Sequence, residues 1–144
     1  MSKAPVKTRE QYTFFLSIQT RWADNDLYGH VNNVTYYSYF DTAANALLIQ
    51  HAGFDLRNTP IIGLVVDSAC SFLQELSYPE IIEVGVGIEK IGNSSLRYDL
   101  AIFKQGQHEA AAQGHFVHVF VDRQTRKSTS IPEDMRDALT QFLL

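Results

Sequence analysis

The sequence has little cysteine and no long apolar run. Its single cysteine, Cys70, excludes a disulfide within the chain and leaves no cysteine-based metal site. The start, Met1 to Pro5, lacks the apolar core of a signal peptide. No apolar run approaches the roughly 20 residues that a membrane-spanning helix needs. These absences favour a cytoplasmic protein without a membrane partner.

Positive charge is also scarce. Lys and Arg number 12 against 16 Asp and Glu, which gives a net charge of −4. Nucleic-acid binding needs clustered Lys and Arg, so this balance argues against a nucleic-acid partner. The basic residues that stand out in the second half suffice only for the few phosphates of a nucleotide-like molecule; they are Lys104, Arg123, Arg126 and Lys127. The chain also lacks a Gly-x-Ser-x-Gly motif, so a serine hydrolase is unsupported.

What is present is typical of one globular domain. Hydrophobic residues make up 45% and charged residues 19% of the chain, which are ordinary values. A chain of 144 residues is long enough to bury a core. Residues 1–11 are polar and are expected to form a flexible N-terminus, so residues 12–144 are interpreted as a single domain.

The hydrophobic pattern predicts a strand and then one long helix. Apolar and polar residues alternate over 12–22, as in a half-buried strand, and a polar loop follows. Apolar residues then recur at helical spacing over about 33–51. Asn32 is a plausible N-cap, and Gly53 suits the position just past the far end of the helix.

Further strands and a short helix are expected in the rest of the chain. The segment 61–73 begins apolar in both phases, as expected for a central strand. Alternation over 82–88 and 96–102 predicts a hairpin, and a last strand is expected over 109–121. Residues 130–133 resemble a capping box ahead of a C-terminal helix. This order predicts an α+β fold in which an antiparallel sheet of about five strands wraps around one central helix.

The loop before the long helix is unusual in composition. Residues 21–36 hold two Asp, a His, a Gly and three Asn. Turns alone favour Asp, Asn and Gly, so a purely structural loop is one interpretation. The other is chemical, because free N–H groups at a helix start polarise a carbonyl placed there. A carboxylate just upstream, such as Asp26, would then attack that carbonyl or deprotonate a water beside it.

The segment from Asp26 to Tyr36 carries a recognisable signature. It resembles the D-x-x-G-H-V-N-N-x-x-Y pattern of the 4-hydroxybenzoyl-CoA thioesterase-like branch of the hot-dog proteins. Flanking residues are also similar to that family: Arg21, Asp24, Tyr37, Tyr39 and Phe40. The resemblance implies a hot-dog fold and an acyl-CoA thioesterase, which hydrolyses a fatty or aromatic acyl-CoA to the free acid and CoA.

The resemblance also implies roles within this segment. Asp26 matches the catalytic carboxylate, which acts as nucleophile or general base, and the backbone amide of Asn33 matches the oxyanion donor. Gly29 lets the loop approach the thioester, and Tyr36 lies near the acyl pocket. His30 binds substrate, orients Asp26 or simply packs in the loop. The rival carboxylate Asp24 is expected to pair with Arg21 or with an adjacent loop.

Coenzyme A is part of the implied substrate, and no separate cofactor or metal is expected. By the resemblance, its phosphates would meet Lys90, Ser94 and Ser95 in one hairpin, and Arg123, Arg126 and Lys127 after the last strand. Each of these residues also fits an ordinary surface or turn role. Pocket depth is expected to depend on Tyr36, Phe40, Phe54, Leu56 and Ile61.

Other reactive side chains have weaker patterns. His115 and His118 lie three positions apart in a strand, so they face opposite sides and do not easily share a metal. Cys70 is expected to be a small hydrophobe in an apolar strand. Glu75 sits near a strand end, where it could reach the site of a second subunit.

The resemblance further implies a homodimer, doubled into a homotetramer, with sites at the subunit interface. Such pairing would protect the edges of a five-stranded sheet. Two other functions stay open at this point: a non-catalytic acyl-CoA-binding module, and a hydratase or dehydratase that uses His30 with Asp26.

Overall fold

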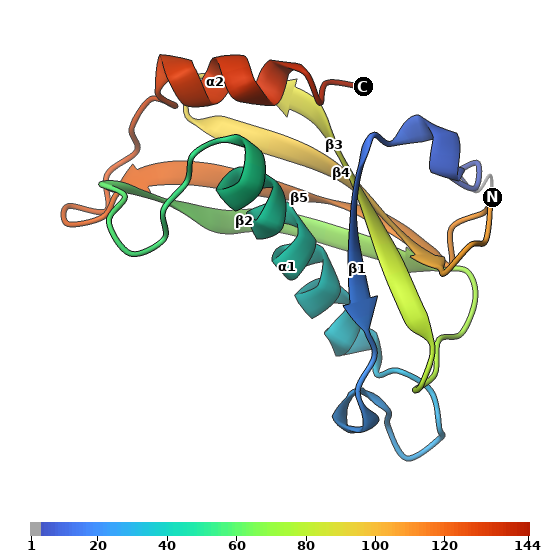
Figure 1. Cartoon of the computed structure of the whole chain (residues 1–144). Coiled ribbons are helices and arrows are strands. Elements are labelled where there is room, and N and C mark those ends of the chain that lie inside the picture. The colour runs from blue at the N-terminus through green and yellow to red at the C-terminus, as the bar shows by residue number, and fades with distance from the viewer. Residues whose placement is uncertain (1–3) are drawn as a thin grey trace.

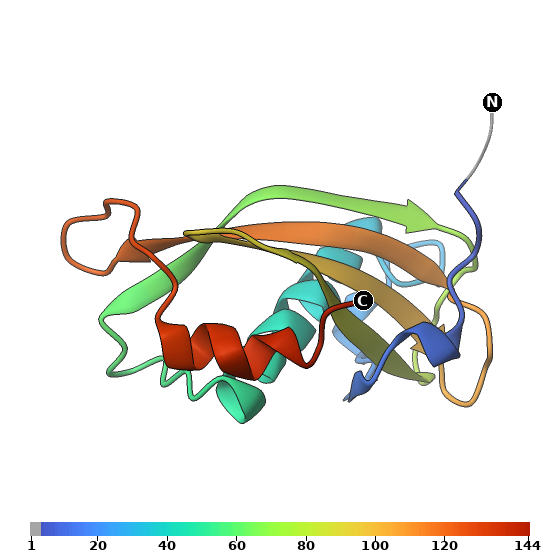
Figure 2. The same ribbon diagram turned by 90° about the horizontal axis from the view of Figure 1, so that it is seen from above.

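The computed structural model describes residues 4–144 and follows the predicted element order. The elements are β1 (Phe14–Gln19), α1 (Asn33–His51), β2 (Ile61–Phe72), β3 (Ile81–Ile91), β4 (Ser95–Lys104), β5 (Ala112–Asp122) and α2 (Glu133–Thr140), with short 3-10 turns η1 (Arg9–Gln11) and η2 (Trp22–Asp24) on either side of β1. The sheet is antiparallel, in the order β1-β3-β4-β5-β2. Both helices lie on one side of the curved sheet (Figures 1 and 2). The predicted hot-dog fold is confirmed.

Helix α1 begins and ends where its capping residues predict. The side chain of Asn32 accepts a hydrogen bond from the Val34 amide, and Gly53 has a φ of 65° directly after the C-cap. The helix packs on the sheet through a stripe in which Phe40, Ala43 and Leu47 are fully buried. The opposite wall comes from alternate, fully buried strand residues: Ile82, Val84, Val86 and Ile88 of β3, and Leu96, Tyr98, Leu100 and Ile102 of β4. Each such large side chain contributes about 1.5–3 kcal/mol of burial.

Strand β2 was predicted to be central, and this is wrong: it is an edge strand that pairs only with β5 among the described residues. Apolar residues in both phases therefore do not mean that β2 has a neighbouring strand on each side. Leu64, Val65 and Val66 are 40%, 44% and 60% exposed. A long edge strand with exposed apolar side chains is a surface on which another chain can pair.

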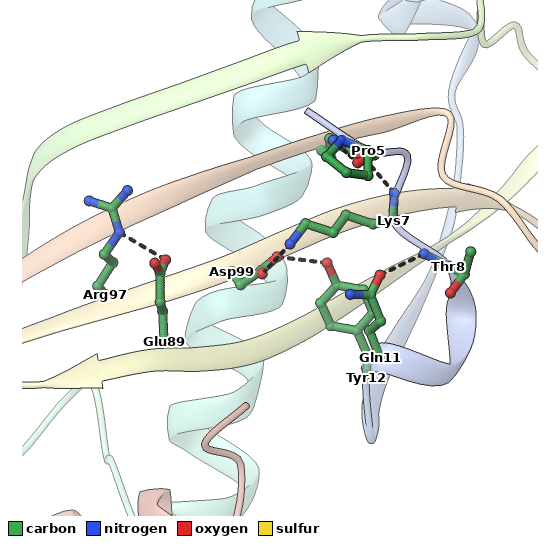
Figure 3. Close-up of polar contacts among 9 residues, drawn as sticks. Pro5, Lys7, Thr8, Gln11, Tyr12, Glu89, Arg97 and Asp99 are labelled. Atoms are coloured by element: carbon green, nitrogen blue, oxygen red, sulfur yellow. Dashed lines mark hydrogen bonds and ion pairs between the residues drawn. The ribbon is translucent and has the colours of Figure 1, made fainter. Parts of the chain in front are cut away.

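The N-terminal segment is tied to the outer face of the sheet (Figure 3). Lys7 donates from its amide to the Gln113 side chain at 2.8 Å and pairs through Nζ with Asp99 at 3.0 Å. The Tyr12 hydroxyl donates to Asp99 at 2.6 Å. The flexible terminus predicted for 1–11 therefore does not describe Lys7 onward, and residues 1–3 lie outside the described residues. No local sequence pattern marks these long-range contacts.

The C-terminal helix is present, but its predicted capping box is not. Helix α2 begins at Glu133 after the N-cap Pro132, whose side chain has no oxygen to cap the free amides, and Ser130 Oγ instead donates to Asn93 Oδ1 at 3.3 Å. After α2 the chain pairs with β3, because the Ile88 amide bonds the Phe142 carbonyl and the Leu144 amide bonds the Ile88 carbonyl, both at 2.9 Å. Within residues 4–144, neither helix has the length and hydropathy to cross a membrane.

Candidate active site

The loop that carries Asp26 is closed at its base by backbone hydrogen bonds. The Asp26 amide donates to the His30 carbonyl at 2.8 Å, and the Gly29 amide donates to the Asp26 carbonyl at 3.2 Å. Gly29 turns the chain with a φ of 84°, a backbone conformation that residues other than glycine rarely adopt. Asp26 and His30 are therefore held at the two ends of one tight turn, directly before α1.

The Asp26 carboxylate is half-buried and only partly used by the protein. Its Oδ1 atom accepts a hydrogen bond from the Tyr28 amide at 2.8 Å, which is an Asx turn that fixes the side chain. Within residues 4–144, its Oδ2 atom has no hydrogen-bond partner. One oxygen thus sets the orientation, and the other is left for a ligand.

The start of α1 presents a free amide beside this carboxylate. The Asn32 side chain accepts from the Val34 amide at 3.1 Å, and the Asn32 carbonyl accepts from the Thr35 amide at 2.9 Å. The Asn33 amide has no partner in the described part of the chain. It carries the partial positive charge of a helix N-terminus, so it favours an atom that bears negative charge.

Asp26 and Asn33 both line one cavity of about 760 Å³. Its wall consists of Asp26, Leu27, Tyr28, His30, Val31, Asn32, Asn33 and Tyr36, and of Phe72, Leu73, Gln74 and Glu75 after β2. Tyr36 is buried and meets Phe72 edge to face, with ring centroids 4.9 Å apart. The structure therefore gathers the predicted residues Asp26, His30, Asn33 and Tyr36, with Gly29 in the adjoining turn.

Asp24 is used elsewhere, as expected. It is 2% exposed, pairs with the Arg21 guanidinium at 3.0 Å, and accepts from the Arg21 amide at 2.8 Å and the Tyr39 hydroxyl at 2.7 Å. Burial acts to raise the pKa of Asp24, but the hydrogen bonds and the charge of Arg21 outweigh it and lower that pKa overall. The predicted pairing with Arg21 is confirmed, and Asp24 does not line the cavity.

A segment that the sequence did not single out supports the loop. The Val31 amide donates to the Leu76 carbonyl at 2.7 Å, the Ser77 hydroxyl donates to the Gly29 carbonyl at 2.6 Å, and the Tyr78 amide donates to the Asn25 side chain at 3.1 Å. Residues 76–78 lie about 50 positions further along the chain. No sequence signal marks these contacts, because they arise only where the end of β2 meets the start of α1.

Glu75 directly precedes this segment and contacts His30. The two side chains pair at 3.0 Å, Nε2 to Oε2, and both line the cavity. The sequence noted Glu75 only as a residue near a strand end. In the structure it reaches the site of its own chain.

The residues expected at the CoA phosphates lie at the other end of the sheet (Figure 1). The Leu73 amide bonds the Ala111 carbonyl at the site end of β2, and the Arg123 amide bonds the Pro60 carbonyl at the far end. Eleven steps of about 3.3 Å make β2 roughly 36 Å long. Within one chain, the residues expected at the CoA phosphates therefore lie far from Asp26. These residues are Lys90, Ser94, Ser95, Arg123, Arg126 and Lys127.

These residues at the far end of the sheet differ in exposure and in the hydrogen bonds that they make. The Arg123 guanidinium donates to the carbonyls of Leu56 and Arg57, so it holds the loop before β2. Lys90, Arg126 and Lys127 are exposed, whereas Ser94 and Ser95 are half-buried in the β3–β4 hairpin, where their carbonyls accept from the amides of Phe120 and Gly92.

The pocket-depth expectation holds only for Tyr36. Phe40 is fully buried in the core under α1, and Leu56 is 49% exposed in a loop. Phe54 and Ile61 border a separate cavity of about 280 Å³ at the far end. These residues were expected to act together because they are apolar, but the chain distributes them from the first turns of α1 to the start of β2.

The two strand histidines face opposite sides, as predicted. His118 points under α1 and bonds the Tyr98 hydroxyl at 2.9 Å, whereas His115 pairs with Asp67 on the outer face at 2.9 Å. Burial lowers the pKa of His118 to about 4. Cys70 packs against the core, and burial raises the pKa of its thiol to about 12.

Comparison with known proteins places this geometry in a family. A model of the thioesterase-like superfamily matches residues 20–139. The chain is similar to the PA5185 protein from Pseudomonas aeruginosa strain PAO1, with 50% identity, a TM-score of 0.94, and coverage of 96% of this chain and 97% of that one. It is also similar to the PA2801 protein from Pseudomonas aeruginosa, with 28% identity, a TM-score of 0.78, and coverage of 86% and 95%.

A DHNA-CoA thioesterase from Staphylococcus aureus shares the fold, at 23% identity and a TM-score of 0.78, with 88% of each chain covered. The family model spans both the Asp26 loop and the sheet that supports it. The chain therefore belongs to the thioesterase-like superfamily.

Proposed function

We propose that this protein hydrolyses a fatty or aromatic acyl-CoA thioester to the free acid and CoA. The observation that carries the proposal is that Asp26 and Asn33 line one cavity, where one Asp26 carboxylate oxygen and the Asn33 amide have no hydrogen-bond partner among residues 4–144. Membership of the thioesterase-like superfamily supports the reaction class. Coenzyme A is part of the substrate, and the proposal invokes no separate cofactor.

The proposed chemistry follows from this pairing. The thioester carbonyl oxygen accepts a hydrogen bond from the Asn33 amide, which stabilises the negative charge that develops on it. Asp26 takes a proton from a water whose oxygen bonds the acyl carbon, and the carbon–sulfur bond then breaks as CoA leaves. In the alternative route, a carboxylate oxygen of Asp26 bonds the acyl carbon, the carbon–sulfur bond breaks as CoA leaves, and water then cleaves the resulting anhydride to the free acid and the Asp26 carboxylate. Tyr36 and Phe72 supply an apolar wall for the acyl group.

We further propose that the working unit is a dimer joined through β2, doubled into a tetramer. Two-fold pairing of a strand with its own copy is antiparallel, so the far end of one chain lies beside the Asp26 end of the other. In that arrangement the exposed residues Lys90, Arg126 and Lys127 approach the second chain's cavity, where they would meet CoA phosphates. The exposed apolar residues of β2 support this pairing.

The first experiment compares two isosteric variants in CoA release from a panel of acyl-CoAs, detected with a thiol reagent. Asp26→Asn is expected to lower kcat by about 10²–10⁴-fold, the usual contribution of a general base. Asp24 lies outside the cavity, so Asp24→Asn should keep most of the activity per folded molecule. The folded fraction is measured by circular dichroism.

Two outcomes would overturn the proposal. One is full activity in Asp26→Asn, which would remove the carboxylate from the reaction. The other is tight acyl-CoA binding by the wild type with no CoA release, which would indicate a binding module. Turnover of an enoyl-CoA instead of thioester hydrolysis would indicate a hydratase.

A further inference from the structure

His30 and Glu75 form a side-chain pair in the same cavity as Asp26, and the proposed chemistry gives this pair no role. The His30 Nε2 and Glu75 Oε2 atoms are 3.0 Å apart, and both residues line the cavity that Asp26 and Asn33 share. The two side chains are 44% and 75% exposed, so their charges alone would stabilise the fold by little. The pair therefore points to a role in the cavity and not to a role in stabilising the fold.

The backbone on both sides of this pair is fixed. His30 closes the Asp26 turn, since its carbonyl accepts from the Asp26 amide at 2.8 Å. Next to Glu75, the Leu76 carbonyl accepts from the Val31 amide at 2.7 Å, and Ser77 bonds the Gly29 carbonyl at 2.6 Å. The two segments are thus joined immediately beside the pair, which sets the approach of Glu75 to the imidazole ring.

The atom that Glu75 contacts determines what the ring offers. A carboxylate only accepts hydrogen bonds, so Nε2 must carry the proton in this contact. In a neutral ring the other nitrogen, Nδ1, then keeps its lone pair and is an acceptor. His30 also lines the cavity with Asp26, so an acceptor on its ring lies among the groups that a reacting water would meet.

We propose that Glu75 is a positioning residue for this reaction and that it acts through His30. The Glu75 carboxylate accepts a hydrogen bond from the protonated Nε2 atom of His30, and Nδ1 accepts a hydrogen bond from the attacking water. The same water gives its other proton to Asp26 as its oxygen bonds the acyl carbon. The inference rests on the proposed thioesterase function and deepens it, because it assigns the orientation of the water to a side chain that follows β2.

The test is a double-mutant cycle on CoA release. Glu75→Ala is expected to lower kcat about tenfold with KM changed by less than about twofold, as expected when an interaction is made mainly in the transition state. In a His30→Ala background, the same Glu75→Ala change should have no further effect. Glu75→Gln should keep activity near the wild-type level, because its amide oxygen still accepts the Nε2 proton.

A matched control is available away from the cavity. Glu10 pairs with His108 at 3.1 Å, and these side chains are 67% and 60% exposed, so Glu10→Ala removes a similar pair away from the cavity. That variant should show wild-type kcat and KM. Thermal unfolding of every variant separates a loss of chemistry from a loss of folded protein.

Three results would overturn the proposal: an equal loss from Glu75→Ala with and without His30, no loss at all, or a loss in Glu75→Gln as large as in Glu75→Ala. These outcomes are distinct from failure of the proposed function. If Asp26→Asn abolishes CoA release and the cycle is additive, only the role of Glu75 fails. If the wild type releases no CoA, the proposed function itself fails.

Discussion

At the scale of residues, Asp24 and Asp26 show how neighbouring carboxylates acquire different roles. Asp24 is enclosed and satisfied by Arg21 and Tyr39, whereas Asp26 keeps one oxygen free toward a cavity. The sequence preferred Asp26 because its spacing to Gly29 fits the family signature that the segment resembles, and the pairing of Asp24 with Arg21 was expected from their closeness in the chain. Glu75 was not predictable as a neighbour of His30, because 45 positions separate them and only the folded sheet joins them.

His118 gives a prediction at the same scale. Burial lowers its pKa from 6.5 to about 4, so the unfolded chain binds a proton more readily than the folded one between these values. Stability should therefore fall as the pH drops from about 6.5 to about 4, by at most about 3 kcal/mol from this residue. In His118→Gln, whose side-chain amide also offers both a donor and an acceptor to the Tyr98 hydroxyl, urea unfolding should show a flatter dependence on pH over this window. An unchanged slope would contradict the prediction.

At the scale of elements, local signals predicted the helices better than the sheet positions. The bounds of α1 agree with its capping residues Asn32 and Gly53, because caps act within one turn. The edge position of β2 could not be read from its sequence, since apolar residues in both phases were taken as a sign of a central strand, whereas several of these side chains are exposed on an edge strand. The Ser130 capping box failed because Asn93, from a distant hairpin, engages that hydroxyl.

The cap of α1 can be tested directly. Asn32→Ala removes the hydrogen bond to the Val34 amide and should lower the free energy of unfolding by about 1 kcal/mol. Asn32→Asp keeps an acceptor at the same position and places negative charge at the positive end of the helix, so it should be neutral or stabilising. Urea unfolding of both variants at pH 7 provides the comparison, and equal stability of the Ala and Asp variants would show that the cap is not used.

At the scale of the whole molecule, the exposed face of β2 predicts the assembly. We expect a mass in solution of at least twice the 16.3 kDa of one chain, measured by sedimentation equilibrium. Val66→Lys places a charge at a 60% exposed position on β2 and should shift the protein toward single chains and lower CoA release. Val6→Lys, at a 40% exposed position on the N-terminal segment, is the matched control and should change neither. A fully active single chain would contradict the expectation.

The two edges of the sheet differ in length, and this difference limits how far such pairing can extend. On one side the sheet ends in β2, with 12 residues, and on the other in β1, with six. Once two chains join through β2, only the two short β1 edges face outward, and a short edge is a poor template for further strands. In the proposed dimer, the inequality between the two edges is therefore expected to favour a closed assembly over an open polymer and so to protect against the formation of fibres.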